Sequence, residues 1–374
     1  MPSVSVIVPI FNGTEFLPAF FGSLVAALPD GSQVIIVDDG SAQPIWSTVP
    51  DFGDGISVER LQNQSNLGYC ASVNRAFPLA TGEIIVQLNS DLVLDPHCIG
   101  AMVDLISREE NVGIVGSKLI YPTTGLVQHV GMAFGHYSKS HVFLELPADH
   151  PLCMRTRSLQ ILTSATAAMS RRVLDRIGPL DDVYYNHNDD IEHCLLAREH
   201  GFTNFMCADS VAYHWESLSG PARFAGVEAA DGVFWARWGS KYKSDFAAFV
   251  DEALDHVLSE APHLEGVPFR VLDLSRSGDS QIVLERLTKH LTGIDRELRR
   301  FRQVSNLARH LRLPLLLPHW IPQEPTPFIY IVDRYRELEE NDLWFSTRRQ
   351  IVSEELIVDV TGVAVRTSQT HLRK

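Results

Sequence analysis

The sequence predicts an α/β protein with a mainly parallel central sheet and flanking helices, followed by a smaller, largely helical C-terminal region. Short β-branched runs alternate with segments of helical periodicity through most of the chain, a pattern typical of consecutive strand–helix–strand units. Several apolar runs end in acidic or amide residues, and such groups at the carboxyl ends of parallel strands usually face a ligand. We expect one domain over residues 1–245 and a second over residues 246–374.

The composition narrows the class of protein. A chain of 374 residues is long enough for two domains, and its net charge of −14 argues against a nucleic-acid-binding protein. The five cysteines form no CxxC pair, which favours a reducing compartment. The sequence has no basic leader and no apolar run of the roughly 20 residues that span a bilayer. We therefore expect a cytoplasmic protein, and leave open peripheral contact with the inner face of the membrane.

The N-terminal half contains the clearest elements. Residues 4–10 predict the first strand, and residues 14–27 predict a helix that Thr14 caps. Further strands are predicted at residues 33–37, 56–61, 83–88 and 112–120, and helices at residues 68–77 and 102–107.

The pattern is less regular in the second half. Residues 121–157 predict a long functional loop, followed by strands at residues 161–169 and 202–213 and helices at residues 191–199 and 251–258. An Arg-rich amphipathic stretch, residues 287–313, is a solvated helix face, or else contacts an acidic partner subunit or an anionic membrane surface. The C-terminal third has no chemical motif, and oligomerisation and acceptor docking are both open as its role.

The ordered motifs resemble those of one enzyme family, the inverting GT-A glycosyltransferases of family 2, and in particular bacterial rhamnosyl- and galactofuranosyl-type transferases. The resemblance covers roughly residues 3–240 and depends on the order and spacing of the motifs together. These are residues 6–12 (VIVPIFN), 37–41 (VDDGS), 66–68 (NLG), 89–91 (NSD), 178–181 (GPLD), 189–192 (DDIE) and His214. The family transfers a sugar from a nucleotide-diphosphate donor, which implies the same activity here.

The resemblance implies a donor site at the ends of the first strands. Asp39 would accept the imide N–H of a uracil or thymine ring, with Pro9, Phe11 and Asn12 beside the base. Asn66 and Gly68 would bind the donor at the start of a helix. A turn closed by Asp39 and a helix cap at Asn66 are the alternative explanations.

A second set of residues corresponds to the metal site of the family. Asn89, Ser90 and Asp91 occupy the position of its DxD motif, with Asn89 in place of the first acid. The resemblance implies that Asp91 and His214 hold Mn²⁺ or Mg²⁺ together with the diphosphate oxygens and water. The loss of one carboxylate also fits a non-catalytic protein that binds a nucleotide sugar or a glycan.

The resemblance also implies the catalytic residues. Asp190 matches the general base that takes the proton of the acceptor hydroxyl, and Asp189 is the alternative base. A neighbouring carboxylate raises the pKa of such a base and a helix N-terminus lowers it, so the net shift stays open. Asp181, Glu192 and Trp215 would lie on the acceptor side. Alternatively, Asp189 and Asp190 only stabilise the start of a helix, and Trp215 only packs in the core.

The predicted function is metal-dependent, inverting transfer of a sugar from a UDP- or dTDP-sugar to a hydroxyl of a glycan, lipid-linked or other glycoconjugate acceptor. A sugar-phosphate nucleotidyltransferase is the second hypothesis. It requires a Gly-rich basic loop near the N-terminus, and residues 11–14 (FNGT) contain neither Lys nor Arg. A homo-oligomer formed through the C-terminal region remains open.

Overall fold

The computed structural model describes residues 2–136, 138–215, 226–294, 325–336, 348, 350–352 and 354–368. The chain forms two compact units, each described here by itself. The first contains Met1–Met132 and Glu145–Tyr242, and the second contains Ala133–Leu144 and Lys243–Lys374. None of the helices in the described ranges is both long enough and apolar enough to cross a bilayer.

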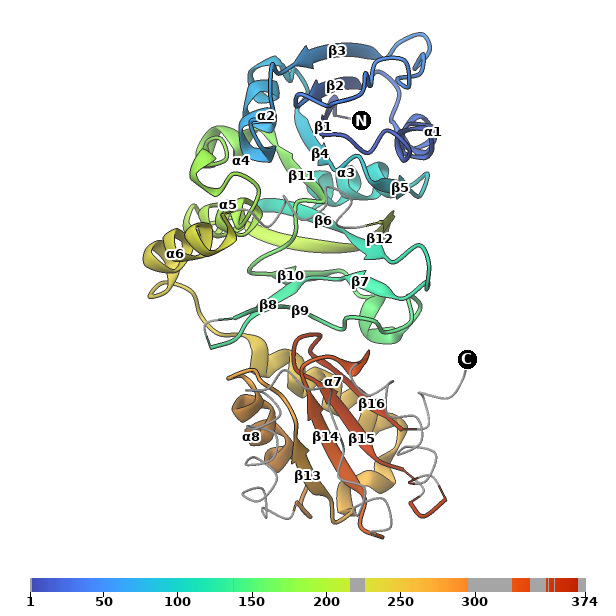
Figure 1. Cartoon of the computed structure of the whole chain (residues 1–374), viewed down its shortest axis with the longest axis vertical. Coiled ribbons are helices and arrows are strands. Elements are labelled where there is room, and N and C mark those ends of the chain that lie inside the picture. Colours follow the sequence, from blue (N-terminus) through green and yellow to red (C-terminus); the bar gives the residue numbers. More distant parts are fainter. Residues whose placement is uncertain are drawn as a thin grey trace. The chain divides into compact units, whose positions relative to one another are not determined.

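The first unit is built on a ten-stranded, mixed sheet (Figure 1). The strands are β1 (Val4–Ile10), β2 (Gln33–Asp38), β3 (Ser57–Gln62), β4 (Ile84–Leu88), β5 (Leu92–Leu94), β6 (Val112–Ile120), β7 (Val127–His129), β10 (Arg157–Leu159), β11 (Thr166–Ser170) and β12 (Thr203–His214). Their order is β10-β12-β6-β11-β4-β1-β2-β3, with β5 paired to β12 and β7 paired to β6. The neighbours from β4 to β3 are parallel, as are β6 and β12, whereas β11 is antiparallel to both β4 and β6. The α/β class with a largely parallel sheet is confirmed.

Six helices of the first unit lie against this sheet or beside it. They are α1 (Leu17–Ala27), α2 (Tyr69–Ala76), α3 (Cys98–Arg108), α4 (Arg171–Ile177), α5 (Asp189–Glu199) and α6 (Val227–Trp238). Because successive strand residues point to opposite faces, Val6 and Val8 share one apolar core with Leu24 of α1 and Met102 of α3. These buried strands fix the loops at their carboxyl ends.

Several helix and strand boundaries differ from those predicted. Thr14 does not cap α1, which begins at Leu17 after Phe16 and has no side-chain cap. Residues 121–157 are less irregular than expected, because their described part contains three short strands, including β8 (Met132–Phe134) and β9 (Lys139–His141), and the first residue of β10. The strand expected from residue 161 begins only at Thr166.

The second unit is smaller, as expected, but it is not largely helical in its described part. Besides α7 (Phe246–Glu260) and α8 (Ser280–His290), it has a sheet of β13 (Arg270–Asp273), β14 (Phe328–Val332), β15 (Leu356–Asp359) and β16 (Ala364–Thr367). The first three strands are parallel and β16 is antiparallel to β15. All five residues of β14 (FIYIV) are buried, and a short continuous apolar run of this kind is typical of a buried strand. The Arg-rich stretch beyond residue 294 lies outside the described residues.

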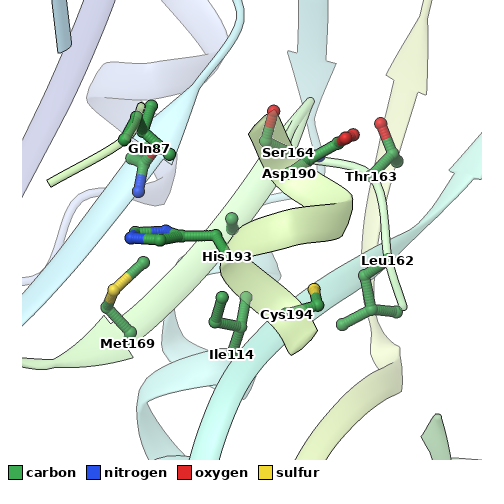
Figure 2. Close-up of a pocket in the computed structure, with 11 residues that line it drawn as sticks. Gln87, Ile114, Leu162, Thr163, Ser164, Met169, Asp190, His193 and Cys194 are labelled. Carbon is green, nitrogen blue, oxygen red and sulfur yellow. The ribbon is translucent and has the colours of Figure 1, made fainter. Parts of the chain in front are cut away.

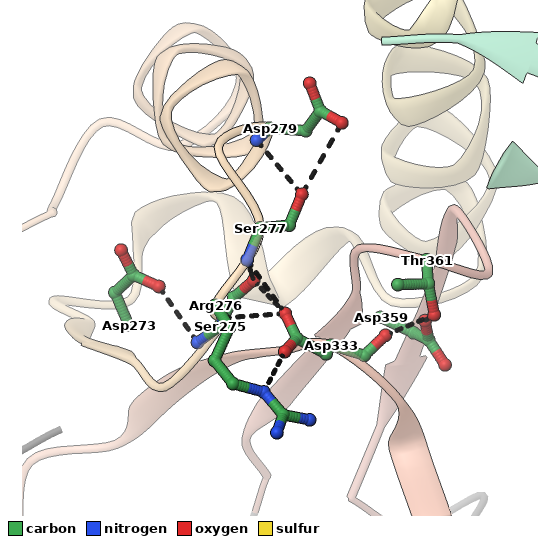
Figure 3. A network of polar contacts seen from close by, with 8 residues as sticks. All are labelled: Asp273, Ser275, Arg276, Ser277, Asp279, Asp333, Asp359 and Thr361. Carbon is green, nitrogen blue, oxygen red and sulfur yellow. Dashed lines mark hydrogen bonds and ion pairs between the residues drawn. The ribbon is translucent and has the colours of Figure 1, made fainter. Parts of the chain in front are cut away.

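Acidic residues lie at the carboxyl ends of these parallel strands too, and Figure 3 shows some of their contacts. Asp333 accepts hydrogen bonds from the Arg276 and Ser277 amides (2.7 and 3.1 Å) and pairs with the Arg276 guanidinium. Asp359 accepts from the Gly362 and Tyr335 amides (2.6 and 2.9 Å). Burial alone would raise the pKa of Asp333, but its hydrogen bonds from Ser275 and Arg276 hold that pKa below the usual value. These carboxylates stabilise the loops of their own unit.

Candidate active site

The donor-site residues gather where β1 and β2 end. Asp39 is almost fully buried and accepts hydrogen bonds from the Asn63 side chain and from the amides of Leu67 and Gly68 (2.6, 2.8 and 3.0 Å). Asn12 lies at φ +59° and links the two strand ends through the Ala42 amide (3.0 Å). Asp39 therefore organises the loop that leads into α2.

At the start of α2, Asn66 and Gly68 contact a residue that the sequence analysis missed. The Tyr185 hydroxyl donates to Asn66 Oδ1 (2.8 Å), and the Tyr185 ring lies over Gly68. A Cβ on Gly68, whose φ is +90°, would lie 2.5 Å from that ring. Tyr185 itself has φ +59°, ψ −68° and an exposed side chain. A positive φ at an aromatic residue is strained, and such strain clusters at functional sites.

The predicted metal ligands lie side by side. Asp91 precedes β5, His214 ends β12, and Asp91 Oδ1 lies 3.1 Å from His214 Nε2. Asp91 Oδ1 is buried and has no hydrogen-bond partner in the described part of the chain. The other ring nitrogen, His214 Nδ1, lies 2.7 Å from Gln128 Oε1.

A divalent cation fits this pair but cannot be held by it alone. Among the described residues, no group of three or more His, Cys, Asp or Glu side chains is placed to bind a metal. An unpartnered carboxylate oxygen beside an imidazole nitrogen is a suitable partial ligand set, which diphosphate oxygens and water would complete. Asn89 and Ser90 are half-buried next to Asp91.

The two candidate bases occupy the first turn of α5 but have different surroundings. Asp190 is half-buried and accepts a hydrogen bond from the Ser164 amide (3.2 Å). Asp189 is buried, and its Oδ2 has no partner among the described residues. Burial, followed by repulsion from Asp190, raises the pKa of Asp189 well above its ordinary value. Of the two, Asp190 is the carboxylate that a substrate can reach.

One short segment connects Asp190 with the strand end that carries Asp91. The Ser164 amide donates to Asp190 Oδ2 (3.2 Å), and the next carbonyl, that of Ala165, accepts from the Asn89 amide (2.9 Å). The candidate base and the Asn89–Asp91 segment are therefore held at the same edge of the sheet by adjacent residues.

Figure 2 shows the residues that line a small pocket beside Asp190. Its lining is largely apolar and includes Leu162 and Met169. His193 also lines it, and the pKa of this histidine is lowered by burial while its Nε2 lies 2.9 Å from the Gly178 carbonyl. Asp190 thus lies at the border of an apolar region, where charges are poorly screened.

The predicted acceptor-side residues separate into two places. Glu192 is buried, and its Oε1 accepts hydrogen bonds from the Tyr184 hydroxyl, the Trp238 indole and Arg237 (3.0, 2.8 and 3.3 Å). Arg237 also pairs with Asp181 (2.7 Å), so Asp181 and Glu192 meet through α6. Trp215 lies elsewhere, next to His214, where it is 41% exposed and its ring centroid is 5.9 Å from that of Phe16.

Three comparisons relate this chain to known proteins. Residues 5–178 match the model of the family "Glycosyl transferase family 2". An uncharacterized protein of Sinorhizobium fredii is 31% identical over 231 residues, which is 58% of this chain and 25% of the relative. The O-antigen biosynthesis protein RfbC of Myxococcus xanthus is 30% identical over 227 residues, 58% of this chain and 18% of the relative. The chain thus spans a quarter or less of the length of these two relatives.

A solved structure shares the fold. GalNAc-T7, crystallised with UDP, GalNAc and Mn²⁺, superposes with a TM-score of 0.51 at 13% identity, over 84% of this chain and 59% of that chain. The family match includes Asp39, Gly68 and Asp91 and ends before Asp190 and His214. Residues 5–178 are therefore similar to glycosyl transferase family 2, and the chain has the GT-A fold.

Proposed function

We propose that the protein is an inverting, metal-dependent glycosyltransferase that moves a sugar from a UDP- or dTDP-sugar to a hydroxyl group. The observation that carries this proposal is the link through Ser164 and Ala165, which holds Asp190 and the Asn89–Asp91 segment at one edge of the sheet. A base and a site for the diphosphate must be neighbours if one transfer reaction uses both.

Asp190 is the general base of the proposed reaction. Its carboxylate takes the proton of the acceptor hydroxyl while the oxygen forms a bond to the anomeric carbon and the bond to the diphosphate breaks, which inverts the centre. Asp91 and His214 would hold a divalent cation, Mn²⁺ or Mg²⁺, that neutralises charge on the leaving diphosphate.

The donor and acceptor classes draw support from the relatives. GalNAc-T7 binds UDP and Mn²⁺, and Asp39 directly follows β2, where the resemblance implies that the base binds. RfbC acts in O-antigen biosynthesis, which favours a growing surface polysaccharide or a lipid-linked glycan as the acceptor. Acceptor docking or self-association is the role proposed for the second unit.

A thermal-shift screen of UDP- and dTDP-sugars with Mn²⁺ or Mg²⁺ identifies the donor, since a ligand of the folded state raises the Tm. With that donor, Asp190→Asn should lower kcat by about 10²- to 10⁴-fold and leave the donor Kd unchanged. Asp91→Ala should instead remove the gain in donor affinity that the metal gives. Normal turnover of Asp190→Asn, or a product that retains the donor's anomeric configuration by NMR, contradicts the proposal.

A further inference from the structure

We propose that Gln128 is a positioning residue that fixes His214 as its Nδ1–H tautomer, so that the Nε2 lone pair and Asp91 face one divalent cation. The juxtaposition behind this inference is a buried amide that contacts both the ring and the backbone of His214. The inference rests on the metal dependence of the proposed function and names the residue that prepares the site for the metal.

The sheet brings these residues together from distant parts of the sequence. The last residues of β6 pair with β12 in parallel along one edge and with β7 in antiparallel along the other. Gln128 lies in the middle of β7, and His214 is the final residue of β12. Both side chains are buried, with residue exposures of 5% and 8%, so their hydrogen bonds are shielded from water.

The backbone contact determines which way the amide of Gln128 faces. The Nε2 of Gln128 lies 3.3 Å from the His214 carbonyl oxygen. A carbonyl oxygen only accepts hydrogen bonds, so the NH₂ group must be the one that faces it. The oxygen of the same amide therefore faces the imidazole ring.

The amide orientation then determines the tautomer. Gln128 Oε1 lies 2.7 Å from His214 Nδ1, and an amide oxygen can only accept, so Nδ1 carries the hydrogen. A neutral imidazole has one N–H, which leaves Nε2 with its lone pair. Metal-binding histidines generally donate their other N–H to such an outer partner, which fixes the ring and makes the ligand more basic.

The lone pair of Nε2 points to a place where another lone pair is already buried. Asp91 Oδ1 lies 3.1 Å away and has no hydrogen-bond partner among the described residues. Two unshared electron pairs at that distance repel each other unless a proton or a cation lies between them, and with Nδ1 already protonated a cation is the partner that fits a neutral ring. Gln128 thus acts at a distance from the substrate, by directing one ligand atom of the site.

Substitutions of Gln128 separate this role from simple packing. Gln128→Glu keeps an acceptor for Nδ1–H, although it buries a charge, whereas Gln128→Leu removes the acceptor and is easier to bury. A packing role predicts that Leu is the better tolerated residue in every measurement. The positioning role predicts the reverse for metal binding: the Mn²⁺ Kd, measured by EPR with UDP present, should rise about 10- to 100-fold for Gln128→Leu and remain nearer the wild-type value for Gln128→Glu.

The tautomer can be observed in the metal-free protein from the ¹⁵N chemical shifts of the His214 ring, assigned by comparison with His214→Asn. The expected result is Nδ1–H in the wild type and in Gln128→Glu, and a mixed or Nε2–H ring in Gln128→Leu. Gln33→Leu is the matched control, because Gln33 is a buried, hydrogen-bonded glutamine at the start of β2. Its substitution should change neither the His214 shifts nor the Mn²⁺ Kd.

The measurements distinguish a failure of the proposed Gln128 role from a failure of the proposed metal dependence. A wild-type His214 that is Nε2–H or an imidazolium at neutral pH overturns the inference. So does an Mn²⁺ Kd that Gln128→Leu leaves unchanged, and in that case the metal dependence of the proposed function stands. A wild-type protein with the Nδ1–H ring that binds no Mn²⁺ in the presence of UDP overturns both.

Discussion

Two neighbouring aspartates of the candidate site differ in their surroundings. Asp189 and Asp190 share the first turn of α5, yet Asp189 is buried with one oxygen that no described residue contacts by a hydrogen bond, while Asp190 is half-buried at a small pocket. Burial raises the pKa of Asp189 well above its ordinary value of 3.8, and the adjacent Asp190 adds to the shift. The shift disfavours a negative charge on Asp189, which leaves Asp190 as the better placed base.

The pKa of Asp189 predicts a pH-dependent stability. Because the folded-state pKa lies above the unfolded one, the folded protein binds more protons between the two values, so stability falls as pH rises through this window. Asn carries no such penalty. Asp189→Asn should therefore raise the Tm at pH 8 by roughly 2–4 °C, the shift that about 1 kcal/mol produces in a domain of this size, and the gain should vanish near pH 4. Thermal melts across pH test this, with the exposed Asp175→Asn as control; an equal gain at both pH values would refute it.

At the scale of elements, the entry into α2 depends on a glycine that faces an aromatic ring. Gly68 and Gly55 have nearly the same φ, +90° and +91°, but a Cβ on Gly68 would meet Tyr185, whereas one on Gly55 would meet nothing within 4 Å. The pair therefore separates backbone strain from steric conflict. Both glycines lie in a region that L-residues rarely adopt.

We expect Gly55→Ala to cost about 1 kcal/mol of unfolding free energy, and Gly68→Ala about 2–3 kcal/mol, because only the second also displaces a ring. Adding Tyr185→Ala should reduce the cost at Gly68 and leave the cost at Gly55 unchanged. Denaturant unfolding of the single and double variants measures this coupling. Equal losses of unfolding free energy at the two glycines would show that the Tyr185 ring moves aside without a cost in stability.

Elements defined by local pattern could be predicted, whereas contacts between distant residues could not. The short β-branched run VSVIVPI predicted the bounds of β1, residues 4–10, because β-branched side chains favour a buried strand. The motifs singled out Asp91, Asp190 and His214, but nothing local points to Gln128, which is 86 positions from His214. In the same way, β13 is only four residues long, too short for periodicity to distinguish it from a loop.

At the scale of the whole molecule, the second unit is assembled from two separate stretches of sequence. Residues 133–144 belong to the second unit, together with residues 243–374. The Phe134 amide donates to Asp245 (2.7 Å), the Phe143 ring lies 6.0 Å from that of Phe249, and the Leu144 amide donates to the Gly362 carbonyl (3.0 Å). A single cut near residue 243 therefore leaves part of the second unit behind.

This arrangement predicts how truncated proteins behave. A chain ending at residue 242 keeps Phe134, Phe143 and Leu144, at most 5% exposed in the full protein, without the partners that bury them. Exposed apolar clusters of this kind promote association. We expect that chain to aggregate, and a version with residues 134–144 replaced by a Gly/Ser linker to be monomeric and to melt at a higher temperature. Size-exclusion chromatography and thermal melts at matched concentrations compare the two; if the simple truncation is equally monomeric and stable, residues 133–144 do not depend on the second unit for burial.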